Sequence, residues 1–217
     1  MPRQNRVDPY GNLIATSARG TLMGNRGCLH DADGRLTRRQ WTTQAWIACR
    51  LSFQGRRRTI MAPGRYTELF FLDEATALAV GHRPCGECRR DAYRNFKAAW
   101  CAGNHRYNLD VEAPVQAIDR IIHAERVGRR RYGPIRAAIG DLPDGVFIHD
   151  DETGTPWLVA GSHLIRWSPF GYDMSRPRPA AGTVSLITPV SIVAAFAAGY
   201  RAGVHPTAAA FAAEPLH

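Results

Sequence analysis

Residues 67–90 read TELFFLDEATALAVGHRPCGECRR and contain the clearest local pattern in the chain. The run 67–72 is rich in aromatic and large apolar residues, which favours a buried strand. Asp73 is a residue type that caps helix N-termini, and Gly81 is the type that most often follows a helix C-terminus. This stretch therefore predicts a strand, a short helix over 74–80 and a turn that contains two cysteines.

The two cysteines of this turn, Cys85 and Cys88, are three positions apart, so both sulfur atoms can face one point. Closely spaced thiolates are ligands that a tetrahedral zinc site uses. A redox-active cysteine pair and two unrelated structural cysteines are the alternatives for the same spacing. Arg89 and Arg90 follow directly, and their charge favours thiolates and attracts phosphate groups. We predict half of a zinc site at this turn.

The same stretch resembles the N-terminal zinc module of Ada-type DNA repair proteins, in which an aromatic strand and a short Ala-rich helix lead to Arg-Pro-Cys-x-x-Cys. The residues that match are Phe70, Phe71, Glu74, Ala75, Leu78, Ala79, Gly81, Arg83, Pro84, Cys85 and Cys88. The resemblance implies that Cys85 and Cys88 bind zinc and that the module faces DNA, including modified or damaged DNA. His82 stands where the family has an aromatic residue, which implies packing or a substrate contact.

The chain departs from this family upstream of the cysteine pair. There the family has a Cys-x-x-x-Cys pair that completes the zinc site and includes the methyl-accepting nucleophile. Residues 54–58 of this chain, in the corresponding region, read QGRRR and contain no cysteine. Self-methylation therefore does not carry over, and the other zinc ligands must come from elsewhere in the chain.

Few residues can supply those ligands. Our predicted set is Cys49, Cys85, Cys88 and His30. Cys28 lies two positions before His30 in the same loop and is the alternative fourth ligand, and Asp31 could accept a hydrogen bond from a ligating imidazole. Cys49 could instead be a small buried residue and His30 a hydrogen-bonded loop histidine. Cys101 ends an apolar helix face and is expected to lie in the core.

The charge of the chain is typical of a nucleic-acid-binding protein. The 217 residues include 28 Lys and Arg against 19 Asp and Glu, a formal charge of +9, and only Lys97 is a lysine. The arginines cluster in the first 136 residues. We predict nucleic-acid contacts, with DNA preferred over RNA, by Arg56, Arg57, Arg58, Arg89 and Arg90. The alternative is a compositional bias toward arginine, with the protein acting as a protein-interaction scaffold.

The remaining pattern predicts an α+β fold. Segment 46–53 is strand-like, and Gln54-Gly55 could turn the chain back into a strand over 58–61. Apolar residues recur at helical spacing over 91–101 and 114–127. Short strands are expected over 146–148, 157–159 and 164–167, with Ser168-Pro169 ending this meander, and a last helix ends near residue 198.

This order predicts a small mixed or antiparallel sheet with helices around the cysteine turn, followed by a C-terminal β-meander and helix. We expect a first domain over 1–140, the meander and terminal helix over 141–203 packed on it, and a frayed tail over 204–217. Residues 177–182 read as a linker. With no long apolar run, no apolar signal segment and an odd number of cysteines, we expect a cytoplasmic protein without a membrane partner.

A second class of function is a metal-dependent nucleic-acid-processing enzyme of nuclease or glycosylase type. Its candidate groups are His30, Asp31 and an Asp119–His123 pair. Asp119 and His123 lie one helical turn apart, and a surface ion pair without a catalytic role is the interpretation that this spacing favours. The zinc-deaminase pattern requires His-x-Glu before Pro-Cys-x-x-Cys. Here His123-Ala124-Glu125 follows the cysteines, so deamination is disfavoured.

Overall fold

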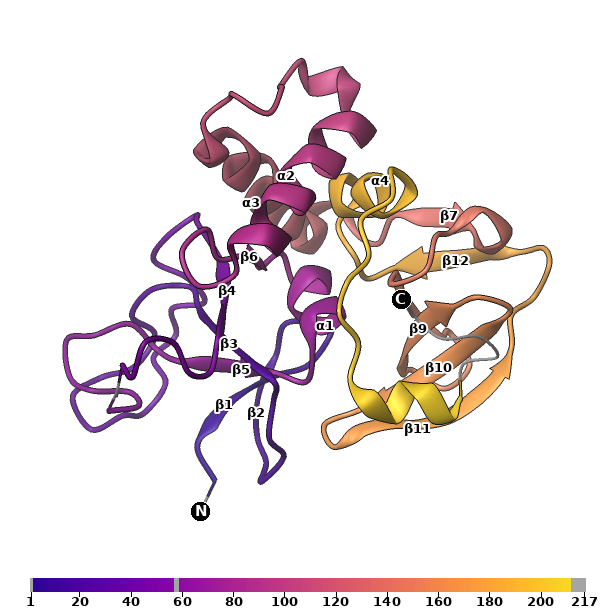
Figure 1. Cartoon of the computed structure of the whole chain (residues 1–217). Helices are drawn as coiled ribbons and strands as arrows, with labels where there is room; N and C mark the ends of the chain where they lie inside the picture. The colour runs from indigo at the N-terminus through magenta and orange to yellow at the C-terminus, as the bar shows by residue number, and fades with distance from the viewer. Residues whose placement is uncertain (1, 57–58, 212–217) are drawn as a thin grey trace.

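The computed structural model describes residues 2–56 and 59–211 and has the predicted α+β architecture. Two six-stranded sheets, each built largely from one half of the chain, form its framework. Figure 1 shows helix α1 (Glu74–Ala79) between the two sheets, with the longer helices gathered at one end. No described helix is long and apolar enough to cross a membrane.

The first sheet has the strand order β2-β1-β5-β3-β4-β6. Its strands are β1 (Gln4–Val7), β2 (Leu13–Ala15), β3 (Leu22–Asn25), β4 (Ile47–Arg50), β5 (Leu69–Phe71) and β6 (Arg83–Pro84). The pairs β1–β5 and β4–β6 are parallel and the others antiparallel. The predicted strands at β4 and β5 are confirmed. The predicted return strand is wrong, because residues 59–61 form no strand and β4 pairs with β3 and β6 instead.

Helix α1 forms as the sequence predicts, and it packs on both sheets. The Asp73 carboxylate accepts a hydrogen bond from the Thr76 amide at 2.8 Å, and Gly81 has a φ of +84° just past the helix end. Ala77 and Val80 of this region pack on the first sheet, whereas Ala75 and Ala79 pack on the second. Since every residue of α1 is buried, the helix is the common layer between the sheets.

Two longer helices follow the cysteine turn, and both were predicted with shorter bounds. Helix α2 spans Arg90–Gly103 and α3 spans Val115–Tyr132, with the short 3-10 helix η1 (His105–Tyr107) between them. Phe96 and Trp100 of α2 meet Ile118 and Ile122 of α3 in the largest core cluster. Cys101 lies in the same cluster and is 7% exposed, which confirms that it is a core residue.

The second sheet is antiparallel throughout and has the order β11-β10-β9-β8-β12-β7. Its strands are β7 (Arg136–Ala138), β8 (Phe147–His149), β9 (Pro156–Ala160), β10 (His163–Ser168), β11 (Gly171–Pro177) and β12 (Thr183–Leu186). The predicted hairpin is confirmed, with Ala160 opposite His163. The meander does not end at Ser168-Pro169, because the chain turns there into β11. This strand was not predicted, since most of its residues are polar and apolar and polar residues do not alternate along it. The expected linker is the connection from β11 to β12.

The C-terminal segment is ordered well past residue 203. Helix α4 (Val190–Ala197) packs on α2, and the 3-10 helix η3 (Pro206–Ala210) packs on β11. Two buried carboxylates anchor the chain between these helices: Glu74 accepts from Tyr200 Oη at 2.6 Å, and Asp73 accepts from the His205 amide at 2.9 Å. The expected fraying is therefore wrong for 204–211, and residues 212–217 lie outside the described residues.

The helices of the first half share a core with the second sheet. Phe96, Trp100 and Ile122 belong to the same buried cluster as Trp157 and Leu164. The predicted boundary at residue 140 falls within a short 3-10 helix, η2 (Ile139–Asp141), just after β7 has joined the second sheet. This packing holds the start of α2, and with it the cysteine turn, against a fixed framework.

Candidate metal centre

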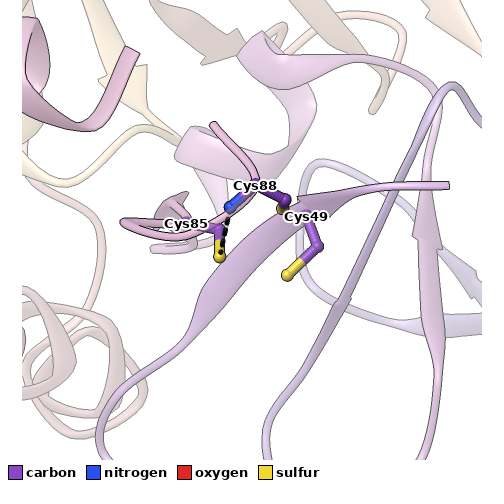
Figure 2. A group of neighbouring side chains, drawn as sticks. All are labelled: Cys49, Cys85 and Cys88. Carbon is purple, nitrogen blue, oxygen red and sulfur yellow. Dashed lines mark hydrogen bonds between the residues drawn. The ribbon is translucent and has the colours of Figure 1, made fainter. Parts of the chain in front are cut away.

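Three cysteines come together at the end of the first sheet. Cys49 lies on β4, Cys85 directly follows β6, and Cys88 precedes α2. The parallel pairing of β4 with β6 sets Ala48 beside Pro84, and the Cys85 amide donates to the Ala48 carbonyl at 3.0 Å. The pairing therefore places Cys49 next to Cys85, and the turn returns Cys88 to the same point, as Figure 2 shows.

The geometry of this cysteine cluster (Cys49, Cys85 and Cys88) suits a metal ion. All three sulfur atoms lie within 4.8 Å of one another. Zn–S bonds of about 2.3 Å in a tetrahedron require sulfur atoms about 3.8 Å apart, so only small side-chain adjustments are needed. Cys88 is buried while Cys49 and Cys85 are half-buried, and all three thiols are free of disulfides. The structure thus brings together three of the four predicted ligands.

Backbone amides point at the sulfur atoms of the cluster. The Glu87 and Cys88 amides donate to Cys85 Sγ at 3.4 and 3.5 Å, and the Arg50 amide donates to Cys88 Sγ at 3.4 Å. Such hydrogen bonds stabilise the thiolate form that a metal requires. Two of the three sulfur atoms accept such bonds. This arrangement fits metal binding, because a protonated thiol does not require amide donors.

The pKa values of the three thiols are shifted in different directions. A hydrogen bond from Cys49, together with the two amide donors, lowers the pKa of Cys85 to about 5. The hydrogen bond to Cys85 and burial raise the pKa of Cys49, and burial raises the pKa of Cys88. One thiolate therefore forms readily, whereas further ionisation is opposed by burial and by negative charge. A bound divalent cation would remove that opposition, since metal binding releases thiol protons.

The arginines near the cluster differ in what they contact. Arg56 is exposed and pairs with the Glu87 carboxylate of the cysteine turn. Arg89 is turned inward and forms an ion pair with Glu74 at 2.7 Å, which leaves it little surface for a phosphate contact. Arg90 is exposed at the start of α2. The predicted contacts Arg57 and Arg58 lie outside the described residues.

His30 and Cys28 do not join the cysteine cluster. The two ring nitrogens of His30 are hydrogen-bonded to Thr67 Oγ1 at 2.6 Å and to the Ala62 carbonyl at 3.2 Å. Cys28 Sγ contacts the His30 carbonyl oxygen at 3.5 Å. His30 is therefore a hydrogen-bonded loop histidine, which was the alternative to its predicted role as a ligand. Within residues 2–56 and 59–211, no fourth His, Cys, Asp or Glu completes the cluster.

The other candidate catalytic groups are also engaged elsewhere. Asp119 accepts two hydrogen bonds from Arg83, at 2.7 and 2.9 Å, so the structure forms a buried ion pair and not the candidate Asp119–His123 pair or a surface ion pair. The His123 ring instead packs edge-on against Trp41, with ring centroids 4.5 Å apart. His82 is fully buried 4.6 Å from the Phe71 ring, which makes it a packing residue without access to substrate.

The buried Arg83–Asp119 ion pair is the feature near the cysteine cluster that sequence reasoning missed. It connects α3 to the residue two positions before Cys85, and Arg83 also donates to the Pro84 carbonyl at 3.2 Å. The arginine of the Arg-Pro-Cys pattern therefore ties the backbone just before Cys85 to α3. Its acidic partner lies on a helix far along the chain, and no local pattern identifies it.

Comparisons with family models, curated proteins and solved structures gave no match for this chain. The function is therefore inferred from the cysteine cluster and the surface around it. The similarity of residues 67–90 to the Ada-type module is confined to one motif.

Proposed function

We propose that the protein binds a zinc ion through Cys49, Cys85 and Cys88 and binds nucleic acid on the surface around this centre. The observation that carries the proposal is the convergence of three sulfur atoms within 4.8 Å, two of which accept backbone amide hydrogen bonds. Thiolate ligands favour zinc over magnesium or calcium, which prefer oxygen. A bound ion would crosslink β4, the turn after β6 and the start of α2.

The nucleic-acid part of the proposal is supported by the charge around this centre. Arg90, Arg94 and Lys97 occupy positions i, i+4 and i+7 of α2, so they share one face of the helix that begins beside Cys88. Arg90 and Arg94 are exposed, and neither belongs to an ion pair in the described part of the chain. Arginine donates bidentately to phosphate and is suited to grip a nucleic-acid backbone. By the Ada-type resemblance, DNA with a modified backbone or base is the first ligand to test.

We expect salt-dependent binding of labelled DNA, and we expect Arg90→Ala/Arg94→Ala to weaken it. Each lost phosphate contact lowers the slope of log K against log salt by about one. The measurement is fluorescence anisotropy from about 50 to about 200 mM salt. Arg120→Ala/Arg201→Ala removes the same charge from other exposed positions and serves as the matched control.

If both double variants lose the same amount of DNA affinity, only the total charge matters. That result would contradict a binding site beside the cysteine cluster. Absence of any binding by the wild-type protein at low salt would contradict nucleic-acid binding altogether. A duplex with and without methylated phosphates or bases, compared at one salt concentration, tests whether modified DNA is preferred.

A second candidate is a metal-dependent nucleic-acid-processing enzyme. The observation in its favour is the three-residue cluster, because catalytic zinc sites use three protein ligands and leave one position for water or substrate. On this hypothesis, zinc-loaded protein converts labelled DNA or RNA into shorter or base-free products, and Cys85→Ser abolishes the conversion. Binding without any product, at protein concentrations that saturate the substrate, would leave the first candidate alone.

A further inference from the structure

One row of side chains crosses the first sheet from the cysteine cluster to its opposite side. The register sets Cys49 opposite Met23, Met23 opposite Phe70, and Phe70 opposite Arg6. Directly opposed residues of neighbouring strands lie on the same face of a sheet. Arg6 therefore shares a face with Cys49, three strands away, and strand spacings of about 4.8 Å put them about 14 Å apart.

A cavity of about 360 Å³ lies at the Arg6 end of this row. We call it the arginine cavity; its polar lining includes Arg3, Arg6, Arg19 and Asn5. None of the described residues that line it is acidic. A concave surface with three guanidinium groups and no carboxylate concentrates positive potential and attracts anions.

In the described part of the chain, no acidic residue forms an ion pair with the arginines of the cavity. Arg6 donates to the Ala18 carbonyl at 2.7 Å, and Arg3 donates to the Ile60 carbonyl at 2.9 Å. Burial and the like charge of Arg19 lower the pKa of Arg6. Carbonyl oxygens orient these guanidinium groups without cancelling their charge, so an anion between them would relieve the repulsion.

A buried amide donor also lines the cavity. Asn5 is 1% exposed, its Oδ1 accepts from Arg6, and its Nδ2 has no hydrogen-bond partner among the described residues. The Asn5 side chain therefore holds the Arg6 guanidinium in place at the cavity wall. Phosphate oxygens in the cavity can accept from the guanidinium groups of Arg3, Arg6 and Arg19 together.

The remaining wall of the cavity is apolar. Leu51 and Ile60 line it and are 51% and 38% exposed, unusually high values for large apolar side chains, and the Phe70 ring lies under Arg6. Leu51 follows β4 by one residue, so this wall lies toward the cysteine cluster. A ligand that fits both the arginine wall and the apolar wall carries a phosphate group joined to a flat apolar group. A nucleotide has this combination.

We propose that the arginine cavity binds the phosphate of a nucleotide unit, with its base or sugar against Leu51 and Ile60. This inference rests on the proposed function where the nucleotide belongs to a strand, because a strand on this sheet face would reach the cysteine cluster. Along the axis of a B-form strand, which rises about 3.4 Å per nucleotide, about 14 Å corresponds to about four nucleotides, and an extended single strand covers this distance with fewer. The cavity would thus be a second phosphate contact that sets the position of the strand over the metal centre.

The test uses the full chain with two probes, thymidine 5′-monophosphate and a labelled thymidine hexanucleotide. Arg3→Ala/Arg19→Ala removes two exposed arginines and keeps Arg6, whose ring contact with Phe70 supports the sheet. We expect the variant to bind both probes about tenfold more weakly, with a smaller salt slope for the hexanucleotide. Arg120→Ala/Arg201→Ala, with the same loss of charge, should bind both probes as the wild type does.

The outcomes separate the two proposals. Hexanucleotide binding by Arg3→Ala/Arg19→Ala with wild-type affinity and salt slope overturns the arginine cavity and leaves the proposed function standing. If the wild-type protein binds the mononucleotide but not the hexanucleotide, and Arg3→Ala/Arg19→Ala does not bind the mononucleotide, the cavity is a nucleotide site and nucleic-acid binding is contradicted. Wild-type protein that binds neither probe overturns both.

Discussion

Cys85→Ser is expected to reduce the zinc content of the purified protein from about one ion per chain to a small fraction of that value. Cys85 receives two of the three amide hydrogen bonds in the cysteine cluster, and its thiolate forms most readily. A serine hydroxyl is a poor zinc ligand at neutral pH, and two remaining sulfur atoms cannot hold the ion firmly. Elemental analysis of protein purified without chelator measures the ratio directly.

The same substitution is expected to lower stability strongly. Metal binding to a site that forms only on folding adds to the free energy of unfolding, with apparent values of about 10–16 kcal/mol in zinc-finger peptides. The cluster joins three separate segments, so its loss should release β6 and the start of α2 from β4. Thermal unfolding with and without chelator should show a large shift in the wild type and almost none in Cys85→Ser.

Two other cysteines provide matched controls. Cys28 and Cys101 lie outside the cluster, so Cys28→Ser and Cys101→Ser should retain zinc, although Cys101→Ser should lose some stability because the residue is in the core. His30→Ala is expected to retain zinc as well, since its ring is bonded to Thr67 and Ala62. Unchanged zinc in Cys85→Ser, or none in the wild type, would rule out the proposed site.

Local patterns predicted the part of the site that is local in sequence. The strand, helix and cysteine turn of residues 67–90 follow from residue types at adjacent positions, and all three form. Cys49 was a weaker prediction, because its place beside Cys85 depends on the parallel pairing of β4 with β6. His30 could not be excluded from sequence, since the Thr67 hydroxyl that binds its ring lies far along the chain.

Two of the differences between sequence and structure share one physical cause. Arg89 was predicted to contact phosphate, yet Glu74 of a preceding helix draws it inward. The segment after residue 203 was predicted to fray, yet the Asp73 carboxylate accepts a hydrogen bond from the His205 amide at 2.9 Å. In each case a buried carboxylate binds a partner that is distant in sequence. Whether a carboxylate is buried cannot be predicted from the residues next to it in the sequence.

Asp119→Ala is expected to destabilise the zinc-loaded protein by about 3–5 kcal/mol. The change leaves the Arg83 guanidinium buried without its carboxylate, in a pair whose side chains are 6% and 4% exposed. Arg83 lies two residues before Cys85, so its displacement should also weaken zinc binding. Urea unfolding gives the stability, and competition with a chromophoric chelator gives the zinc affinity.

Two control variants distinguish a buried unpaired charge from the loss of any ion pair. Asp151→Ala breaks the exposed Arg136–Asp151 pair and should cost less than about 1 kcal/mol. Arg83→Leu/Asp119→Leu removes both charges and should recover much of the stability lost in Asp119→Ala, because apolar pairs often replace buried ion pairs without loss. If the double variant is no more stable than Asp119→Ala, packing rather than charge holds α3 against the cysteine turn. Zinc affinity that stays at the wild-type value in Asp119→Ala would show that the pair stabilises the fold without supporting the metal centre.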